Sequence, residues 1–146
     1  MTADASKARL ILYHKQSTSA RTRFLRLDYG GICAFEPLPT LSSYIDDDDF
    51  DNDDNIRLHP AQLISDAEQR MGLKNGGLAA DGDYHARVDT PDGIVHVYLA
   101  RFTAVDPPFE TAENIGGKFI ALTEARGRPP AEMELLRQAY AAVMEG

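Results

Sequence analysis

Carboxylates are the most concentrated chemical group in this sequence, and they gather in one short segment. Seven of the nine residues from position 46 to position 54 are aspartates, and the aromatic residue Phe50 lies among them. The aspartates are Asp46, Asp47, Asp48, Asp49, Asp51, Asp53 and Asp54. Carboxylate oxygens at this density could bind a divalent cation or attract a positively charged protein surface.

A calcium loop of the EF-hand type is excluded by the spacing of these residues. Such a loop needs a glycine at its sixth position and a bidentate glutamate at its twelfth. Counted from Asp49, those positions hold Asp54 and Pro60. A looser divalent-cation site in the run stays open as an alternative. Because nothing in the spacing fixes a coordination geometry, we predict no metal ligands and no cofactor.

The distribution of charge favours a protein partner for the acidic run. Removing the seven aspartates from the net charge of −8 would leave −1. Blocks of like charge usually stay solvated, so we predict a flexible acidic loop at about residues 42–56. Phe50 within this loop could anchor it in a groove of a basic partner protein. We therefore predict a protein-interaction module, although the loop could also lie against the chain's own basic N-terminal segment.

A second set of polar residues lies in the segment 83–105 and just after it. Imidazole, guanidinium and phenol groups donate hydrogen bonds to anions. The members are His85, Arg87, His96, Tyr98 and Arg101, followed by Asp106 and Glu110. No HxH, HxxxH or CxxC pattern is present, which gives a zinc site little support. If these side chains converge, they line a pocket for a small anionic ligand, and such a binding protein or enzyme is the alternative function.

The segment that carries this polar set is predicted to be a β-hairpin around the turn TPDG at positions 90–93. Turn chemistry favours a three-residue loop with Gly93 in a bulge, whereas the side-chain pattern favours a two-residue loop. The second register pairs Val88 with Val95, Ala86 with Val97 and Tyr84 with Leu99. It gathers apolar residues on one face, and burial usually sets register, so we favour it. In that register His85 and His96 share a face, and in the other they do not.

The sequence offers no familiar catalytic motif. There is no GxSxG nucleophile motif and no glycine-rich phosphate loop. The single cysteine, Cys33, lies in the apolar stretch GGICAFE, which predicts a buried strand position rather than a nucleophile. These features favour a protein that is not an enzyme.

Length and composition indicate one globular domain. The chain has 146 residues, of which 43% are hydrophobic and 26% charged. No apolar run approaches the roughly 20 residues of a membrane span, and the first residues lack a secretory signal, so we expect a cytoplasmic protein without membrane contact. Overall acidity argues against nucleic-acid binding. A homodimer through a sheet edge or the last helix fits a domain of this size, but no residue requires it.

Hydrophobic periodicity predicts the elements that must position these groups. Strands are expected at 8–15, 21–29 and 32–35 and in the hairpin, and helices within 59–73 and 128–146. Segment 109–127 has helical spacing, with a strand in KFIALTEA as the alternative. The last helix is expected to bury Met133, Leu136, Tyr140 and Val143 or Met144. The predicted fold is α+β, a mainly antiparallel sheet with two or three helices packed on one side.

Overall fold

The computed structural model describes residues 8–16, 21–39, 41–45, 60–125 and 127–145. The strands are β1 (Ala8–Lys15), β2 (Thr22–Arg26), β3 (Cys33–Ala34), β4 (Ser43–Tyr44), β5 (Leu78–Thr90), β6 (Gly93–Phe102) and β7 (Lys118–Ile120). The helices are α1 (Pro60–Met71), α2 (Phe109–Asn114) and α3 (Pro130–Glu145), with a short 3-10 helix η3 at Leu122–Glu124.

All the described strands belong to one sheet, in the order β4-β5-β6-β1-β2-β7, with β3 beside the first half of β1. Among the described pairings, β1 with β6 is parallel and the others are antiparallel. The predicted α+β fold with a mainly antiparallel sheet is therefore confirmed at this level.

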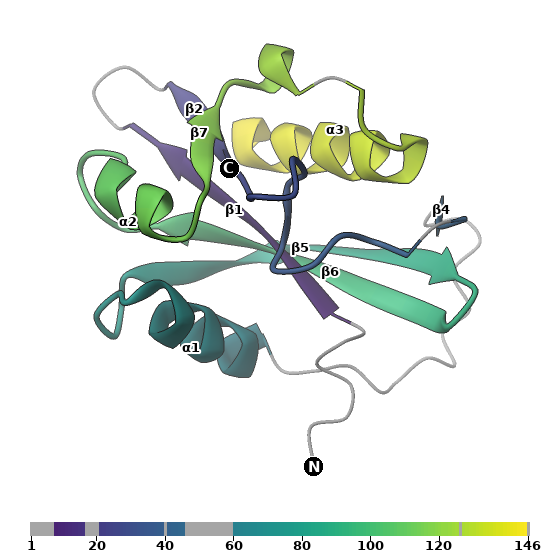
Figure 1. Cartoon of the computed structure of the whole chain (residues 1–146), viewed down its shortest axis with the longest axis horizontal. Helices are drawn as coiled ribbons and strands as arrows, with labels where there is room; N and C mark the ends of the chain where they lie inside the picture. The colour runs from purple at the N-terminus through teal and green to yellow at the C-terminus, as the bar shows by residue number, and fades with distance from the viewer. Residues whose placement is uncertain (1–7, 17–20, 40, 46–59, 126, 146) are drawn as a thin grey trace.

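The helices cover both faces of the sheet, which corrects the prediction that they pack on one side. In Figure 1, α3 lies above the sheet and α1 lies below it. Ile11 of β1 belongs to the apolar cluster that includes α3, whereas Leu10 and Leu12 belong to the cluster that includes α1 and α2. A strand that is apolar on both sides must be covered on both sides, because either face left open would expose its side chains to water.

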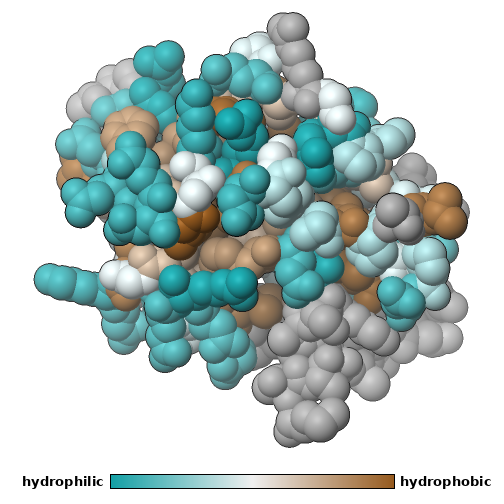
Figure 2. All heavy atoms as spheres, viewed as in Figure 1, coloured by the Kyte–Doolittle hydropathy of each residue, from teal (hydrophilic) through white to brown (hydrophobic). Residues whose placement is uncertain are grey.

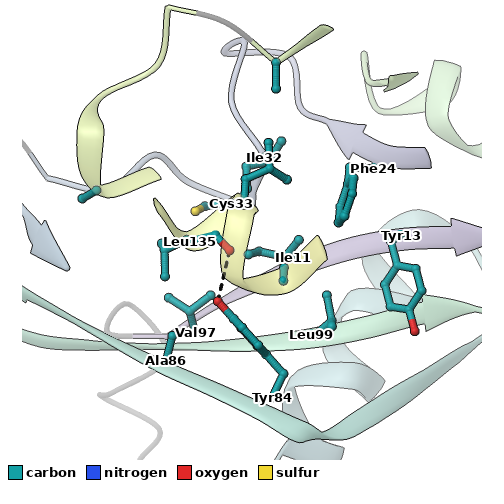
Figure 3. Packing of buried hydrophobic residues seen from close by; sticks show 14 of the residues in the cluster. Ile11, Tyr13, Phe24, Ile32, Cys33, Tyr84, Ala86, Val97, Leu99 and Leu135 are labelled. Carbon is teal, nitrogen blue, oxygen red and sulfur yellow. Dashed lines mark hydrogen bonds between the residues drawn. The ribbon is translucent and has the colours of Figure 1, made fainter. Parts of the chain in front are cut away.

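The core between α3 and the sheet is built from alternate residues of the central strands (Figure 3). Its helical contribution is Ala131, Leu135, Leu136, Ala139 and Val143. The Tyr84 hydroxyl donates to the Leu135 carbonyl oxygen at 3.3 Å, which ties β5 to the helix. The predicted buried stripe of the last helix is right at Leu136 and Val143. Tyr140 is half-buried but packs against this core, with its ring centroid 6.4 Å from that of Phe24. The prediction is wrong at Met133, which is half-buried and outside the cluster, because the helix is rotated toward Leu135 and Ala139.

The hairpin adopts the two-residue loop that the apolar pattern favoured. Val88 pairs with Val95 and Ala86 with Val97, as predicted. The third predicted pair does not form, because a bulge between Asp81 and His85 places Asp81 opposite Leu99. Below the bulge, β5 and β6 continue to Leu78 and Phe102.

Segment 109–127 contains both of the elements that were predicted as alternatives. The helix α2 ends at Asn114 and the strand β7 begins at Lys118. Between them Gly116 has a φ of +76°, and a Cβ added at Gly117 would lie 2.9 Å from the Arg26 carbonyl oxygen. Two glycines therefore separate the elements where the chain turns against β2.

Hydrophilic side chains cover most of the described surface in the view of Figure 2, and apolar side chains show mainly between the α3 layer and α1. Within the described ranges, no helix combines the length and apolar character that crossing a membrane would require.

Candidate functional site

Three aromatic rings of the hairpin meet on the face of the sheet that α1 covers. After the bulge, Tyr84, Ala86 and Val88 alternate toward α3, so His85 and Arg87 lie on the other face. His85 pairs across the strands with Tyr98, and their ring centroids are 4.9 Å apart with planes at 12°. His85 Nε2 and His96 Nδ1 are 2.9 Å apart, so one of the two rings donates a hydrogen bond to the other.

Arg87 completes this group, which we call the hairpin set: His85, Arg87, His96 and Tyr98. Arg87 pairs across the strands with His96. Arg87 is only 7% exposed and Tyr98 only 5%. Burying a guanidinium away from water is costly unless it has hydrogen-bonding partners, so such a group on a sheet face marks a candidate site. The carboxylate residue Asp89 lies on the same face nearer the turn and is exposed.

Arg101 does not join the hairpin set. It pairs with Tyr13, which belongs to the cluster on the α3 side, and it is exposed. Arg101 is five positions after His96, and residues an odd number of positions apart along a strand point to opposite faces of the sheet. Asp106 and Glu110 lie beyond the end of β6, where Gln16 Nε2 donates to Asp106 at 3.4 Å.

Tyr13 and Asp81 form a separate polar contact on the α3 side of the sheet. The Tyr13 hydroxyl donates to Asp81 Oδ2 at 3.2 Å. Burial, followed by the charge of the Asp81 carboxylate, raises the pKa of Tyr13 to about 12. The phenol is therefore neutral at physiological pH.

Cys33 is completely buried in β3, so the predicted buried strand position is confirmed. Burial, with a smaller contribution from the Glu132 carboxylate, raises the pKa of its thiol well above the usual range. Its neighbour Tyr29 accepts from the Cys33 backbone N–H at 2.9 Å and donates to the Cys33 carbonyl oxygen at 2.7 Å. A thiol that stays protonated and buried cannot act as a nucleophile.

Two buried glutamates hold loops in place. Glu132, which is 2% exposed, accepts from the Ile32 backbone N–H at 2.8 Å and forms a salt bridge with Arg128 at 3.2 Å. Glu68 accepts from the backbone N–H groups of Gly76 and Leu78 at 2.9 and 3.1 Å. Hydrophobic periodicity had predicted neither, because it takes only apolar residues as candidates for burial, although Glu132 is four residues before Leu136 and Glu68 four residues after Ile64.

His14, one of the other histidines, is also buried, at 1% exposure in β1. Its Nε2 lies 2.8 Å from the Ala104 carbonyl oxygen, which can only accept, so Nε2 carries the proton. His14 therefore serves to join β1 to the loop after β6.

A half-open cavity of about 210 Å³ lies between α1 and the first half of β1. Its lining residues are Ala8, Arg9, Leu10, Ala34, Phe35, Glu36, Leu63, Asp66, Ala67 and Arg70. Ala8 and Leu10 are the β1 partners of His96 and Tyr98, so the cavity floor and the hairpin set are neighbours on one face of the sheet. No sequence pattern predicted this cavity, because its shape depends on how α1 docks on β1 and β3.

The acidic run Asp46–Asp54, including Phe50, lies outside the described residues, and its predicted roles stay predictions. Ser43 and Tyr44, at the start of the predicted loop, form β4 against β5. Within the described ranges, no three histidine, cysteine or acidic residues are grouped so that they could hold a metal ion.

No protein-family model and no curated protein matches this sequence.

Proposed function

We propose that this chain is a binding protein for a small anionic ligand, which would lie against the hairpin set on the α1 face of the sheet. The observation that carries the proposal is the grouping of Arg87, His85, His96 and Tyr98 within two strands. A guanidinium that is always charged, imidazole N–H groups and a phenol O–H are suited to carboxylate or phosphate oxygens.

Burial supports this function, since an anion beside a shielded guanidinium is attracted more strongly than one beside an exposed guanidinium. Arg87 is 7% exposed, whereas Arg101 on the opposite face is exposed. The guanidinium has five N–H donors, so it can bind a ligand oxygen in addition to its existing partners or in place of one of them. The exposed Asp89 would repel an anion, so we expect the ligand nearer His85 than the turn.

The test is a thermal melt with inorganic phosphate and, separately, with benzoate, at fixed ionic strength. An anion present at about 100 times its Kd stabilises by roughly 2.7 kcal/mol, which raises the melting temperature of a domain of this size by several degrees. We expect Arg87→Gln to lose the rise and Arg101→Gln, the matched control on the other face, to keep it. Each variant is compared with its own anion-free melt, and His85→Gln gives a second variant in the set. A rise with neither anion, or one that depends on Arg101 rather than Arg87, would contradict the proposal.

Three expectations from the sequence stay proposals beside the anion site. They are contact of the acidic run with a basic partner protein, the alternative of a divalent cation in that run, and a cytoplasmic location. Capture of a basic protein that weakens with added salt, and ends when all seven aspartates are changed to asparagine, would support the first.

A further inference from the structure

The cavity beside α1 carries charges of both signs around an apolar floor. The floor consists of aliphatic side chains: Ala8, Leu10, Ala34, Leu63 and Ala67. The Phe35 ring, two arginines and two carboxylates complete the lining, and the charged residues are Arg9, Arg70, Glu36 and Asp66. A site for a simple anion or cation would carry charges of one sign, whereas this lining carries both signs.

Arg9 is part of the wall itself. It is 5% exposed. All three nitrogens of its guanidinium donate to backbone carbonyl oxygens: Nε to Glu36 at 2.9 Å, Nη1 to Ala8 at 3.0 Å and Nη2 to Pro37 at 3.1 Å. These bonds hold the chain after β3 against β1. Arg9 therefore shapes the cavity, and the exposed charges on its rim are Glu36, Asp66 and Arg70.

Asp66 and Arg70 are four residues apart on α1, a spacing at which an aspartate and an arginine can form an ion pair. They do not pair with each other. Gln62 Nε2 donates to Asp66 Oδ1 at 3.1 Å, while the Arg70 guanidinium lies 4.6 Å from the centre of the Phe35 ring. Within the described part of the chain, neither charge forms a salt bridge. A carboxylate and a guanidinium are thus held on the same rim, about one helical turn apart.

We propose that this cavity binds a small zwitterion, an α-amino acid with an aliphatic side chain. Arg70 would hold the ligand carboxylate, Asp66 would hold its ammonium group, and the aliphatic side chain would lie on the apolar floor. The cavity volume of about 210 Å³ is below the roughly 300 to 1,000 Å³ of sites for drug-sized molecules, which suits a ligand of this size. None of the hairpin set lines the cavity, so the two sites can be tested separately.

Calorimetric titration of the full chain with L-leucine tests the site, with two derivatives as comparators. N-acetyl-leucine keeps the carboxylate and lacks the ammonium group, whereas leucinamide keeps the ammonium group and lacks the carboxylate. We expect leucine to bind and each derivative to bind at least about tenfold more weakly, because each leaves one rim charge without its partner. Failure of leucine to bind, or equal binding of all three, would overturn the proposal.

Substitutions on α1 provide the second arm of the test. Asp66→Asn and Arg70→Gln change exposed side chains, so both variants should fold, and each should weaken leucine binding by about tenfold or more. Gln69→Ala, an exposed residue of the same helix outside the cavity, should leave it unchanged. Unchanged binding in both charge variants would overturn the assignment. Loss of phosphate or benzoate binding in Arg87→Gln with leucine binding intact would show that the two sites are separate.

Discussion

At the scale of single residues, Glu132 shows how a buried charge can organise a turn. Its carboxylate lies between the backbone N–H of Ile32 and the side chain of Arg128. A Cβ added at Gly31 would clash with the Glu132 carboxylate and the Tyr29 ring, so a larger residue there would have to displace one of these side chains. The turn between β2 and β3 and the start of α3 are therefore fixed to each other by one carboxylate.

Removing that carboxylate should be costly. Glu132→Ala leaves the Ile32 N–H without its acceptor and breaks the salt bridge of Arg128, so we expect a loss of about 2 kcal/mol or more in the free energy of unfolding. Glu134→Ala, two residues further along the same helix, removes only surface contacts, the ion pair with Arg137 and the hydrogen bond from Gln138 Nε2, and should cost less than about 1 kcal/mol. Urea unfolding measures both, and equal losses would contradict the structural role of Glu132.

At the scale of elements, β1 explains why the helix arrangement was predicted wrongly. Its sequence ARLILYHK is apolar at consecutive positions, and Ile11 and Leu12 are both completely buried although they face opposite sides. Such a run is typical of a strand covered on two faces, so the sequence does contain the signal for a second helical layer. The rotation of α3 was not readable, because Ala131 and Ala139 become core only through their contact with the sheet.

The rotation of α3 leads to a direct prediction about its packing. Leu135 is fully buried, so Leu135→Ala should lower the free energy of unfolding by about 2–5 kcal/mol. Met144, one of the two residues predicted to end the buried stripe, is 43% exposed, so Met144→Ala should cost less than about 1 kcal/mol. Chemical denaturation distinguishes the two, and a larger loss for Met144 would mean that the helix packs in the orientation predicted from the sequence.

The hairpin shows which parts of the candidate site could be predicted from the sequence. The apolar pattern gave the register of Val88 and Val95, and that register brings His85 and His96 to one face. Arg101 was included by proximity in sequence, although its odd spacing from His96 already indicated the opposite face. The bulge between Asp81 and His85 was not predicted, because its position depends on the pairing of β5 with β6 over their whole length and not on the residues near the turn. The cavity needs three separate segments to meet and has no local signature.

At the scale of the whole molecule, three buried groups should make the fold sensitive to alkali. Burial raises the pKa of Tyr13 to about 12, and it also raises the pKa values of Tyr29 and Cys33. Each group is neutral in the folded protein at a pH where its unfolded counterpart has already lost its proton. The stability that they contribute is therefore complete below about pH 8.5 and falls as the pH rises toward 12.

Unfolding by urea at pH 7.5 and at pH 11 tests this dependence. We expect a clearly lower free energy of unfolding at the higher pH. In Tyr13→Phe, which cannot ionise at this position, the decrease between the two values should be smaller than in the wild type. A decrease of the same size in the variant would mean that Tyr13 does not contribute to the alkaline loss.

The proposed function requires that the hairpin set is the anion site. The direct measurement is an NMR titration with inorganic phosphate that follows the ring C–H signals of His85 and His96 and the Nε–H signals of Arg87 and Arg101. Anion binding should shift the signals of His85, His96 and Arg87 in a saturable way, with one common Kd, and should leave those of Arg101 and the buried His14 unchanged. Signals of the hairpin set that stay in place while the phosphate concentration rises, or shifts confined to Arg101, would contradict the proposed function.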